Sequence, residues 1–273
     1  MSFQVPGPQG LDYKPCRYGT SRLSFRGPAR LLDKRYIAFL GTTETYGKYI
    51  PRPFPALTED LLGTPCVNLG FVNAGHDLYI NDPVVMEIAG EARISVVQIG
   101  GAHNLSNRFY TVHPRRNDRF LRASRLMHQI FRDVDFTDFA FTRHMLESLH
   151  RFAPDRFALL REELQEAWIA RTRLLADRLG GRVILLWFAD HPPPDGSPAQ
   201  GLGPDPLFIE GAMIDALRRN VAEVVTVTIS TDTHSREGMV VPPGEEPAAA
   251  DMPGPAAHLE AARALAPVLR DHL

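Results

Sequence analysis

The sequence predicts an α/β fold built on a doubly wound, five-stranded parallel sheet, and two observations carry this prediction. Five short apolar runs show little polar alternation, which is typical of parallel strands buried on both faces. Helical patterns lie between these runs, and alternating strands and helices favour parallel strands joined by crossovers. A chain of 273 residues, 44% of them apolar, is long enough to bury the core of such a sheet.

The five strands are expected in the flavodoxin-like order 2-1-3-4-5. The runs that predict them span residues 36–40, 66–69, 94–99, 183–188 and 224–229. Helices are expected over residues 155–179, 209–219 and 255–270. Gly180 and Gly181 stop the first of these helices, and Pro255 opens the last in the first-turn position that proline favours.

The segments around this core predict the domain organisation. Residues 1–30 are rich in proline and glycine and are expected to form an irregular arm, followed by one domain over residues 31–273. The gap between strands three and four is far longer than a crossover needs, so residues 104–180 are expected to form a largely helical insertion. Residues 238–254 have a loop composition and are expected to cover one edge of the sheet.

Composition excludes several classes of protein. A net charge of −2 argues against a protein that mainly neutralises nucleic acid or anionic lipid. Cys16 and Cys66 do not form a C-x-x-C pair, which favours two reduced thiols in a cytoplasmic protein. No signal peptide is evident and no apolar stretch approaches 18 residues. We therefore expect no nucleic-acid or membrane partner.

The most informative segment is the turn after the first strand, Gly41-Thr42-Thr43-Glu44-Thr45-Tyr46-Gly47. Ligands of open parallel sheets bind at the carboxyl ends of the strands, so this turn is the first candidate site. Gly41 permits a sharp turn, and three threonines follow at or near a helix N-terminus, where free N–H groups favour anions. The alternative is a tight turn whose threonines cap a helix.

This turn resembles the nucleophile loop of the SGNH (GDSL) hydrolases, G-D-S-x-T-x-G. Gly41, Thr45 and Gly47 match the spacing, Thr43 lies at the position of the serine nucleophile and Thr42 at that of the aspartate. The resemblance covers strand and loop order over roughly residues 35–270 and implies an SGNH-like fold. The whole chain also resembles an uncharacterised bacterial family of unknown function.

The later blocks of the SGNH family imply further site residues. Gly70 or Gly75, with Asn104 or Asn107, would supply oxyanion donors after strands two and three. The final D-x-x-H block is matched only in part. Asp251 is present, but Gly254 lies at the histidine position and His258 arrives four residues later. The resemblance thus implies Thr43 as nucleophile, His258 as base and Asp251 as its orienting carboxylate.

Two clusters lie outside this pattern. The polar stretch after strand three contains Arg108, Arg115, Arg116 and Arg119, whose guanidinium groups suit phosphate, sulfate or carboxylate. The alternative is a solvated loop in which these arginines pair with nearby aspartates. His76, His103 and His234 are secondary candidates for a base. These histidines lack metal-ligand spacing, so no metal and no cofactor are expected.

Two function hypotheses follow. The first is an esterase or acyltransferase acting on an anionic or carbohydrate-linked acyl substrate, in which Thr43 attacks or positions the carbonyl. The second is a binding protein on the same scaffold that has lost catalysis and recognises an anionic ligand through the arginines of residues 108–119. Both expect a small-molecule or saccharide-linked partner, and neither predicts an oligomeric state.

Overall fold

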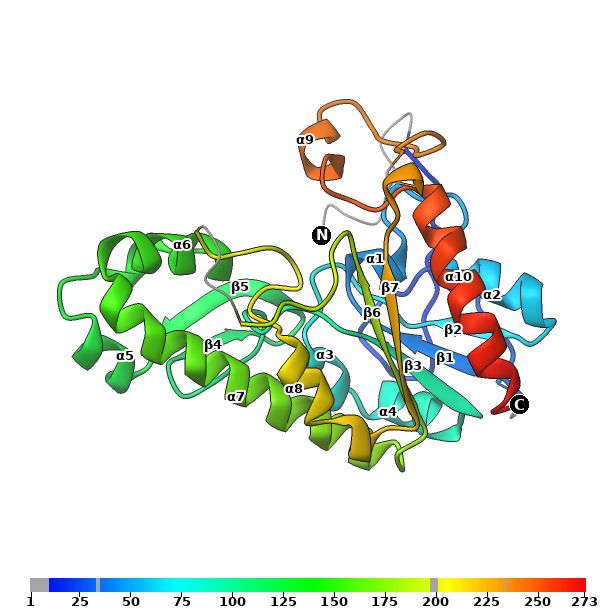
Figure 1. Ribbon diagram of the computed structural model, residues 1–273, viewed down its shortest axis with the longest axis horizontal. Coiled ribbons are helices and arrows are strands. Elements are labelled where there is room, and N and C mark those ends of the chain that lie inside the picture. The colour runs from blue at the N-terminus through cyan, green and yellow to red at the C-terminus, as the bar shows by residue number, and fades with distance from the viewer. Residues whose placement is uncertain (1–9, 33–34, 197–200, 234) are drawn as a thin grey trace.

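The structure is a computed structural model and describes residues 10–32, 35–196, 201–233 and 235–273 (Figure 1). Within these ranges it contains a five-stranded parallel sheet in the order β2-β1-β3-β6-β7. The strands are β1 (Ile37–Leu40), β2 (Cys66–Asn68), β3 (Ile94–Gln98), β6 (Val183–Ala189) and β7 (Glu223–Thr228). The predicted fold class and strand order are confirmed.

The register explains why the strands read as continuous apolar runs. Phe39 of β1 pairs with Asn68 of β2 on one side and with Val96 of β3 on the other. Every residue of β1, β3 and β6 is buried, because helices cover both faces of the sheet. Only the edge strand β7 alternates towards solvent, from buried Val225 and Val227 to exposed neighbours.

Two helical layers cover the sheet. One face packs against α2 (Phe54–Leu62) and α10 (Pro255–Arg270), and the core there includes Ile37 and Phe39 of β1. The other face takes the alternate residues of β1 and packs against three further helices. These are α3 (His76–Ile80), α4 (Pro83–Glu91) and part of α7 (Pro154–Arg178). His258, in the first turn of α10, therefore lies on the face of the sheet that packs against α2 and α10.

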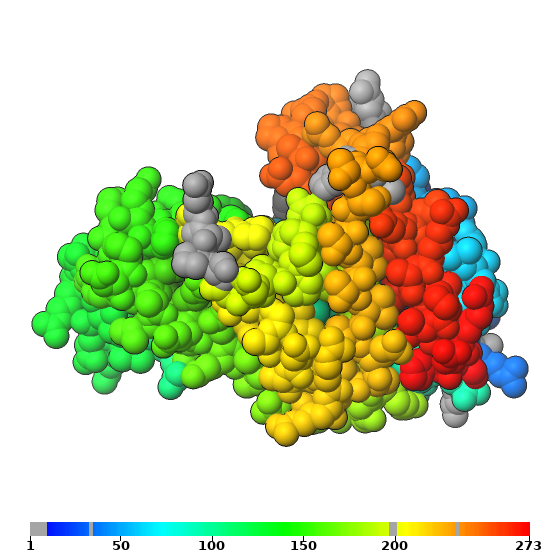
Figure 2. Space-filling view, in the orientation of Figure 1, coloured from blue at the N-terminus to red at the C-terminus, as the bar shows by residue number. Residues whose placement is uncertain are grey.

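The segment between β3 and β6 projects to one side of the sheet (Figures 1 and 2). It is helical as predicted, but it also contains an antiparallel hairpin that the sequence pattern did not predict. The hairpin strands are β4 (Tyr110–His113) and β5 (Arg116–Ala123), followed by α5 (Arg125–Ile130), η1 (Phe136–Asp138), α6 (Thr142–Phe152) and α7. Only every second residue of β4 is buried, so its pattern is obscured by the surrounding polar residues.

Described residues of the N-terminal arm pack against the site loop. Phe25 is fully buried, and Arg26 is only 7% exposed. The guanidinium of Arg26 donates to the carbonyl oxygens of Gly47 at 2.6 Å and Pro51 at 2.8 Å. These contacts hold the end of α1 (Thr43–Tyr46), the short helix that follows β1.

The helix expected over residues 209–219 is shorter in the structure. It comprises α8 (Gly211–Asp215) and the 3₁₀ turn η2 (Arg218–Asn220), because the chain must reverse within a few residues to enter β7. Residues 238–254 form the expected loop, which carries the short helix α9 (Glu246–Ala249), after the 3₁₀ turn η3 (Thr231–Thr233). Both cysteines are free thiols. Across the described ranges, no helix combines the length and the apolar character needed to cross a membrane.

Candidate functional site

A cleft of about 720 Å³ lies at the carboxyl edge of the parallel sheet. Its lining comes from the segments that follow all five strands of the parallel sheet, together with α6 of the insertion and the loop before α10. The polar lining residues are Thr42, Thr43, Glu44, Lys48, Asn73, Gln98, His103, Asn104, Arg143, Asp190, Asp205 and Asp251. This is the edge at which ligands of open α/β sheets bind.

The loop after β1 is held by β3 and α3. Gly41 is sterically required, because a Cβ atom there would lie 2.1 Å from Thr45 Oγ1 and 2.6 Å from Gln98 Cβ. Tyr79 clamps the backbone of Gly41 by donating its hydroxyl to the carbonyl at 2.5 Å and accepting the amide N–H at 3.2 Å. Gln98 Oε1 accepts the backbone N–H groups of Thr42 and Thr45, both at 3.1 Å.

Thr43 lies in the cleft, and its hydroxyl is bonded to a neighbouring loop. It donates to Asn73 Oδ1 at 3.2 Å and accepts the backbone N–H of Asn73 at 3.1 Å. Asn73 has a φ of +55°, in the left-handed region that asparagine tolerates better than most residues. Among the described residues, no histidine bonds to the Thr43 hydroxyl, so its closest polar partner is an amide and not a base.

Glu44 belongs to the site loop itself, and its side chain lines the cleft. Its Oε2 atom accepts hydrogen bonds from Thr42 Oγ1 and from Gln98 Nε2, the latter at 2.8 Å. Gln98 therefore uses both ends of its side chain, with its oxygen on the backbone of the loop and its nitrogen on Glu44. Thr42, which lies at the aspartate position of the family pattern, becomes a partner of this carboxylate.

Asn104 connects the cleft to the insertion. Its Nδ2 donates to the carbonyl oxygen of Asn73 at 3.4 Å, and its Oδ1 accepts the hydroxyl of Thr142 at 3.0 Å. Thr142 is the first residue of α6, so the insertion supports this wall of the cleft directly. Asn104 is 8% exposed and lines the cleft beside Thr43.

The structure does not bring His258 to Thr43. His258 is fully buried in the core layer beneath α10, between the rings of Phe54 and Phe188. Its Nδ1 accepts the backbone N–H of Phe54 at 3.1 Å. Burial, with a smaller contribution from the positive charge of Arg26, lowers the pKa of His258 to about 3. Asp251 is exposed on the rim of the cleft and makes no hydrogen bond to this imidazole among the described residues. The expected Thr–His–Asp relay is therefore not assembled.

The expected glycine oxyanion donors are already engaged. The N–H of Gly70 donates to Asn68 Oδ1 at 2.9 Å, and that of Gly75 donates to Asn117 Oδ1 at 2.7 Å. Asn107 is used locally, where its Oδ1 caps the backbone at the start of β4. Of these candidates, only Asn104 lines the cleft.

The histidines that were secondary candidates for a base lie in different surroundings. His103 lines the cleft, while His76 is buried against the indole of Trp168. Burial lowers the pKa of both to about 4. His234 lies outside the described residues. Within the described ranges, no three histidine, cysteine, aspartate or glutamate side chains gather as a metal site.

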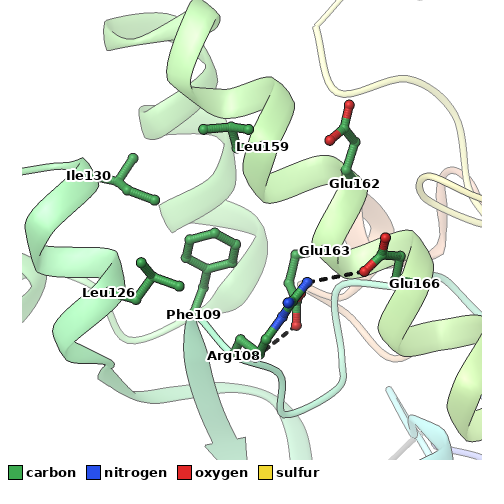
Figure 3. Close-up of a pocket in the computed structure, with 8 residues that line it drawn as sticks. All are labelled: Arg108, Phe109, Leu126, Ile130, Leu159, Glu162, Glu163 and Glu166. Carbon is green, nitrogen blue, oxygen red and sulfur yellow. Dashed lines mark hydrogen bonds and ion pairs between the residues drawn. The ribbon is translucent and has the colours of Figure 1, made fainter.

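The arginines of residues 108–119 do not converge on the cleft. Arg108 lies in a separate pocket of about 250 Å³ on the insertion, where it pairs with Glu163 and Glu166 of α7 (Figure 3). Arg115 and Arg116 are exposed around the hairpin turn, and Arg119 stacks over Phe141. Arg108 is paired, but with glutamates of α7 and not with the nearby aspartates that the alternative expected.

The charge of the cleft is predominantly negative. Its described lining contains four carboxylates, on Glu44, Asp190, Asp205 and Asp251, against two basic side chains. Both basic side chains already have acidic partners: Lys48 pairs with Glu245 at 3.0 Å, and Arg143 pairs with Asp205. An anionic ligand would meet uncompensated carboxylates, so this cleft does not favour the anionic substrate expected from the sequence.

Several polar residues of the cleft were not singled out from the sequence, among them Glu44, Asn73, Gln98 and Arg143. Gln98 carries a usable signal, because it is a polar residue at the carboxyl end of an otherwise apolar strand. Asn73 lies two residues before Gly75, in a segment already under consideration. Arg143 has no such signal, since only the folded insertion brings α6 to the sheet.

Comparisons with known proteins complete the description of the site. No curated protein sequence matches the chain. Among solved structures, a "putative GDSL-like lipase" from Bacteroides ovatus ATCC 8483 aligns with 87% of this chain at 11% identity and a TM-score of 0.44. This chain spans about half of that protein, 53% of its length. A family model matches residues 1–273 in full, so the chain belongs to the family described as Domain of unknown function (DUF6473).

Proposed function

We propose that the cleft binds a small, uncharged and polyhydroxylated molecule of the saccharide class. The observation that carries this proposal is the composition of the described lining, in which amide and hydroxyl groups accompany carboxylates that exceed the cations. Carboxylates accept hydrogen bonds from ligand hydroxyls, and amides both donate and accept them. Partly exposed apolar side chains of the lining, such as Val72 and Met252, provide apolar surface beside these polar groups.

The disposition of Thr43 supports binding more directly than hydrolysis. Its hydroxyl is held by Asn73, and the buried His258 is engaged by Phe54. A threonine hydroxyl needs an adjacent base to become a nucleophile. With no base bonded to it among the described residues, Thr43 is placed to orient a ligand.

A binding assay with defined sugars tests this proposal. Glucose and N-acetylglucosamine serve as neutral probes and glucose 6-phosphate as the anionic probe, followed by two-dimensional NMR of the amide signals. We expect the neutral sugars to move the signals of Thr43, Asn73 and Asn104, and the phosphate to weaken binding. Tighter binding of the phosphate than of both neutral sugars would contradict the proposal.

The variant Thr43→Val keeps the shape of the side chain and removes its hydroxyl. We expect it to weaken sugar binding about three- to tenfold, the usual effect of one hydrogen bond. Thr111→Val is the matched control, because Thr111 lies on β4 and does not line the cleft. An equal effect of both variants would remove Thr43 from the site.

Hydrolysis or transfer of an acyl group is the second candidate. It is favoured by the position of Thr43 at the first residue of α1, where the amides of Thr43 and Glu44 have no acceptor among the described residues and can stabilise an oxyanion. Release of nitrophenolate from p-nitrophenyl acetate tests it, with wild type compared to Thr43→Val. Equal rates in the two proteins would exclude Thr43 as the nucleophile.

A further inference from the structure

The imidazole of His103 lies in the wall of the cleft, and no group of the described residues hydrogen-bonds to it. His103 is 9% exposed and follows β3 in the turn that begins at Gly100. Its Nδ1 is buried, and neither ring nitrogen bonds to any residue in the described part of the chain. Buried ring nitrogens of His150 and His258 also lack a partner among the described residues, but neither of these residues lines the cleft. Among the described histidines, His103 alone lines the cleft, and because neither of its nitrogens bonds to these residues, its ring is available to a ligand.

The backbone fixes the position of this ring. The His103 carbonyl accepts the hydroxyl of Tyr110 at 2.7 Å, and the N–H of Ala102 donates to Leu207 at 2.9 Å. The ring folds back over Gly101, where a Cβ atom would lie 2.7 Å from His103 Nδ1. With Nδ1 turned inward, Nε2 is the ring nitrogen left to meet a bound molecule.

Two charged groups act on the ring from different elements. Arg143 comes from α6, Asp205 comes from the loop that precedes Pro206, and the two side chains form an ion pair on the same cleft. Burial is the main cause that lowers the pKa of His103 to about 4, while Asp205 raises it and Arg143 lowers it. The imidazole is therefore neutral near pH 7 and has a lone pair available.

We propose that His103 is the ligand-contacting imidazole of this cleft and that its Nε2 atom accepts a hydrogen bond from a ligand hydroxyl. This inference rests on the proposed binding of a polyhydroxylated molecule. It names the residue that accepts a hydrogen bond from one of the hydroxyls of that molecule. It also assigns a role to a histidine that the SGNH resemblance does not place in the site.

Substitution at His103 tests the contact, with N-acetylglucosamine and glucose as probes. We expect His103→Phe to weaken binding at least tenfold and His103→Gln, which retains an acceptor, to restore part of the affinity. His76→Phe is the matched control, because His76 is equally buried but does not line the cleft. Unchanged affinity in His103→Phe would overturn the proposal, and thermal unfolding of each variant establishes that it is folded.

A pH profile separates ligand contact from a merely structural role. In wild type, sugar binding should stay constant from pH 8 to pH 5, because His103 remains neutral over that range. Arg143→Gln leaves Asp205 unopposed and should raise the pKa of His103, so that binding weakens at a higher pH than in wild type. Coincident profiles for the two proteins would contradict the contact between His103 and the ligand.

The NMR readout distinguishes this inference from the function on which it rests. If a probe shifts the signals of Thr43 and Asn73 but leaves the His103 ring unmoved, the contact is absent although the cleft binds sugar. If no probe shifts any signal of the cleft, the proposed function fails and this inference fails with it.

Discussion

Gln98 Oε1 accepts two hydrogen bonds from Thr45, one from its backbone N–H at 3.1 Å and one from its hydroxyl at 2.5 Å. Gln98 is 5% exposed and Thr45 is fully buried, so water cannot replace these bonds. The same oxygen also holds the N–H of Thr42. One side chain on β3 therefore sets the conformation of the whole turn after β1.

Gln98→Leu should destabilise the fold by about 1–3 kcal/mol, because it leaves buried donors on the site loop without an acceptor. Urea unfolding followed by circular dichroism measures this change. Gln129→Leu is the control, since Gln129 is exposed and its side chain makes no hydrogen bond within the described residues. A loss no larger than that of the control would show that the loop does not depend on Gln98.

Tyr79→Phe should also cost about 1–3 kcal/mol, because both backbone groups of Gly41 lose their partner. The matched variant is Tyr46→Phe, in the same loop, whose hydroxyl makes no hydrogen bond to the described residues. The unfolding temperature measured by calorimetry should therefore be clearly lower for Tyr79→Phe than for Tyr46→Phe. The reverse order would contradict the clamp on Gly41.

Gly41→Ala should destabilise the protein by about 1–3 kcal/mol or more, because the new methyl group overlaps Thr45 and Gln98. Gly90→Ala should change the stability in the opposite direction. Gly90 lies within α4, and no atom stands within 4 Å of a Cβ placed there. This second change should stabilise the helix by about 0.5–1 kcal/mol. Similar thermal midpoints for the two variants would refute the close packing at Gly41.

His258 should make stability depend on pH. Its pKa is lowered from 6.5 to about 3 in the folded chain. Its contribution is therefore fully present above pH 6.5 and is lost as the pH falls from 6.5 towards 3, where only the unfolded chain takes up the proton. His258→Gln should flatten the decline between pH 6.5 and 4.5 by up to about 1.4 kcal/mol per pH unit. Urea midpoints across that range measure the slope, and parallel slopes would count against a neutral buried imidazole.

The sheet could be predicted because burial of a strand on both faces requires an apolar sequence. Strands covered on both faces must be apolar throughout, as β1, β3 and β6 are. The hairpin of β4 and β5 was not predicted, because most of its residues are not buried and three residues of β5 are arginines. The position of the cleft followed from topology alone, since parallel strands all end at one edge.

The partners within the cleft were harder to predict. Motif spacing suggested His258, but spacing does not tell which layer of the fold a helix joins. The periodicity of α10 contains a better signal, because His258 shares a face with Ala261, Ala262 and Leu265, all of which are buried. Asn73 and Arg143 depend on long-range packing, which a single sequence does not reveal.

The bonds from Arg26 to the end of α1 have a consequence for cooperativity. Arg26 lies 21 residues before Gly47, so the loop cannot open without breaking its bonds to the arm. The arm and the site should therefore behave as one unit in hydrogen exchange, with amides of both exchanging at similar rates. Trimming the apparently irregular N-terminal residues would then loosen the mouth of the cleft before it affected the sheet.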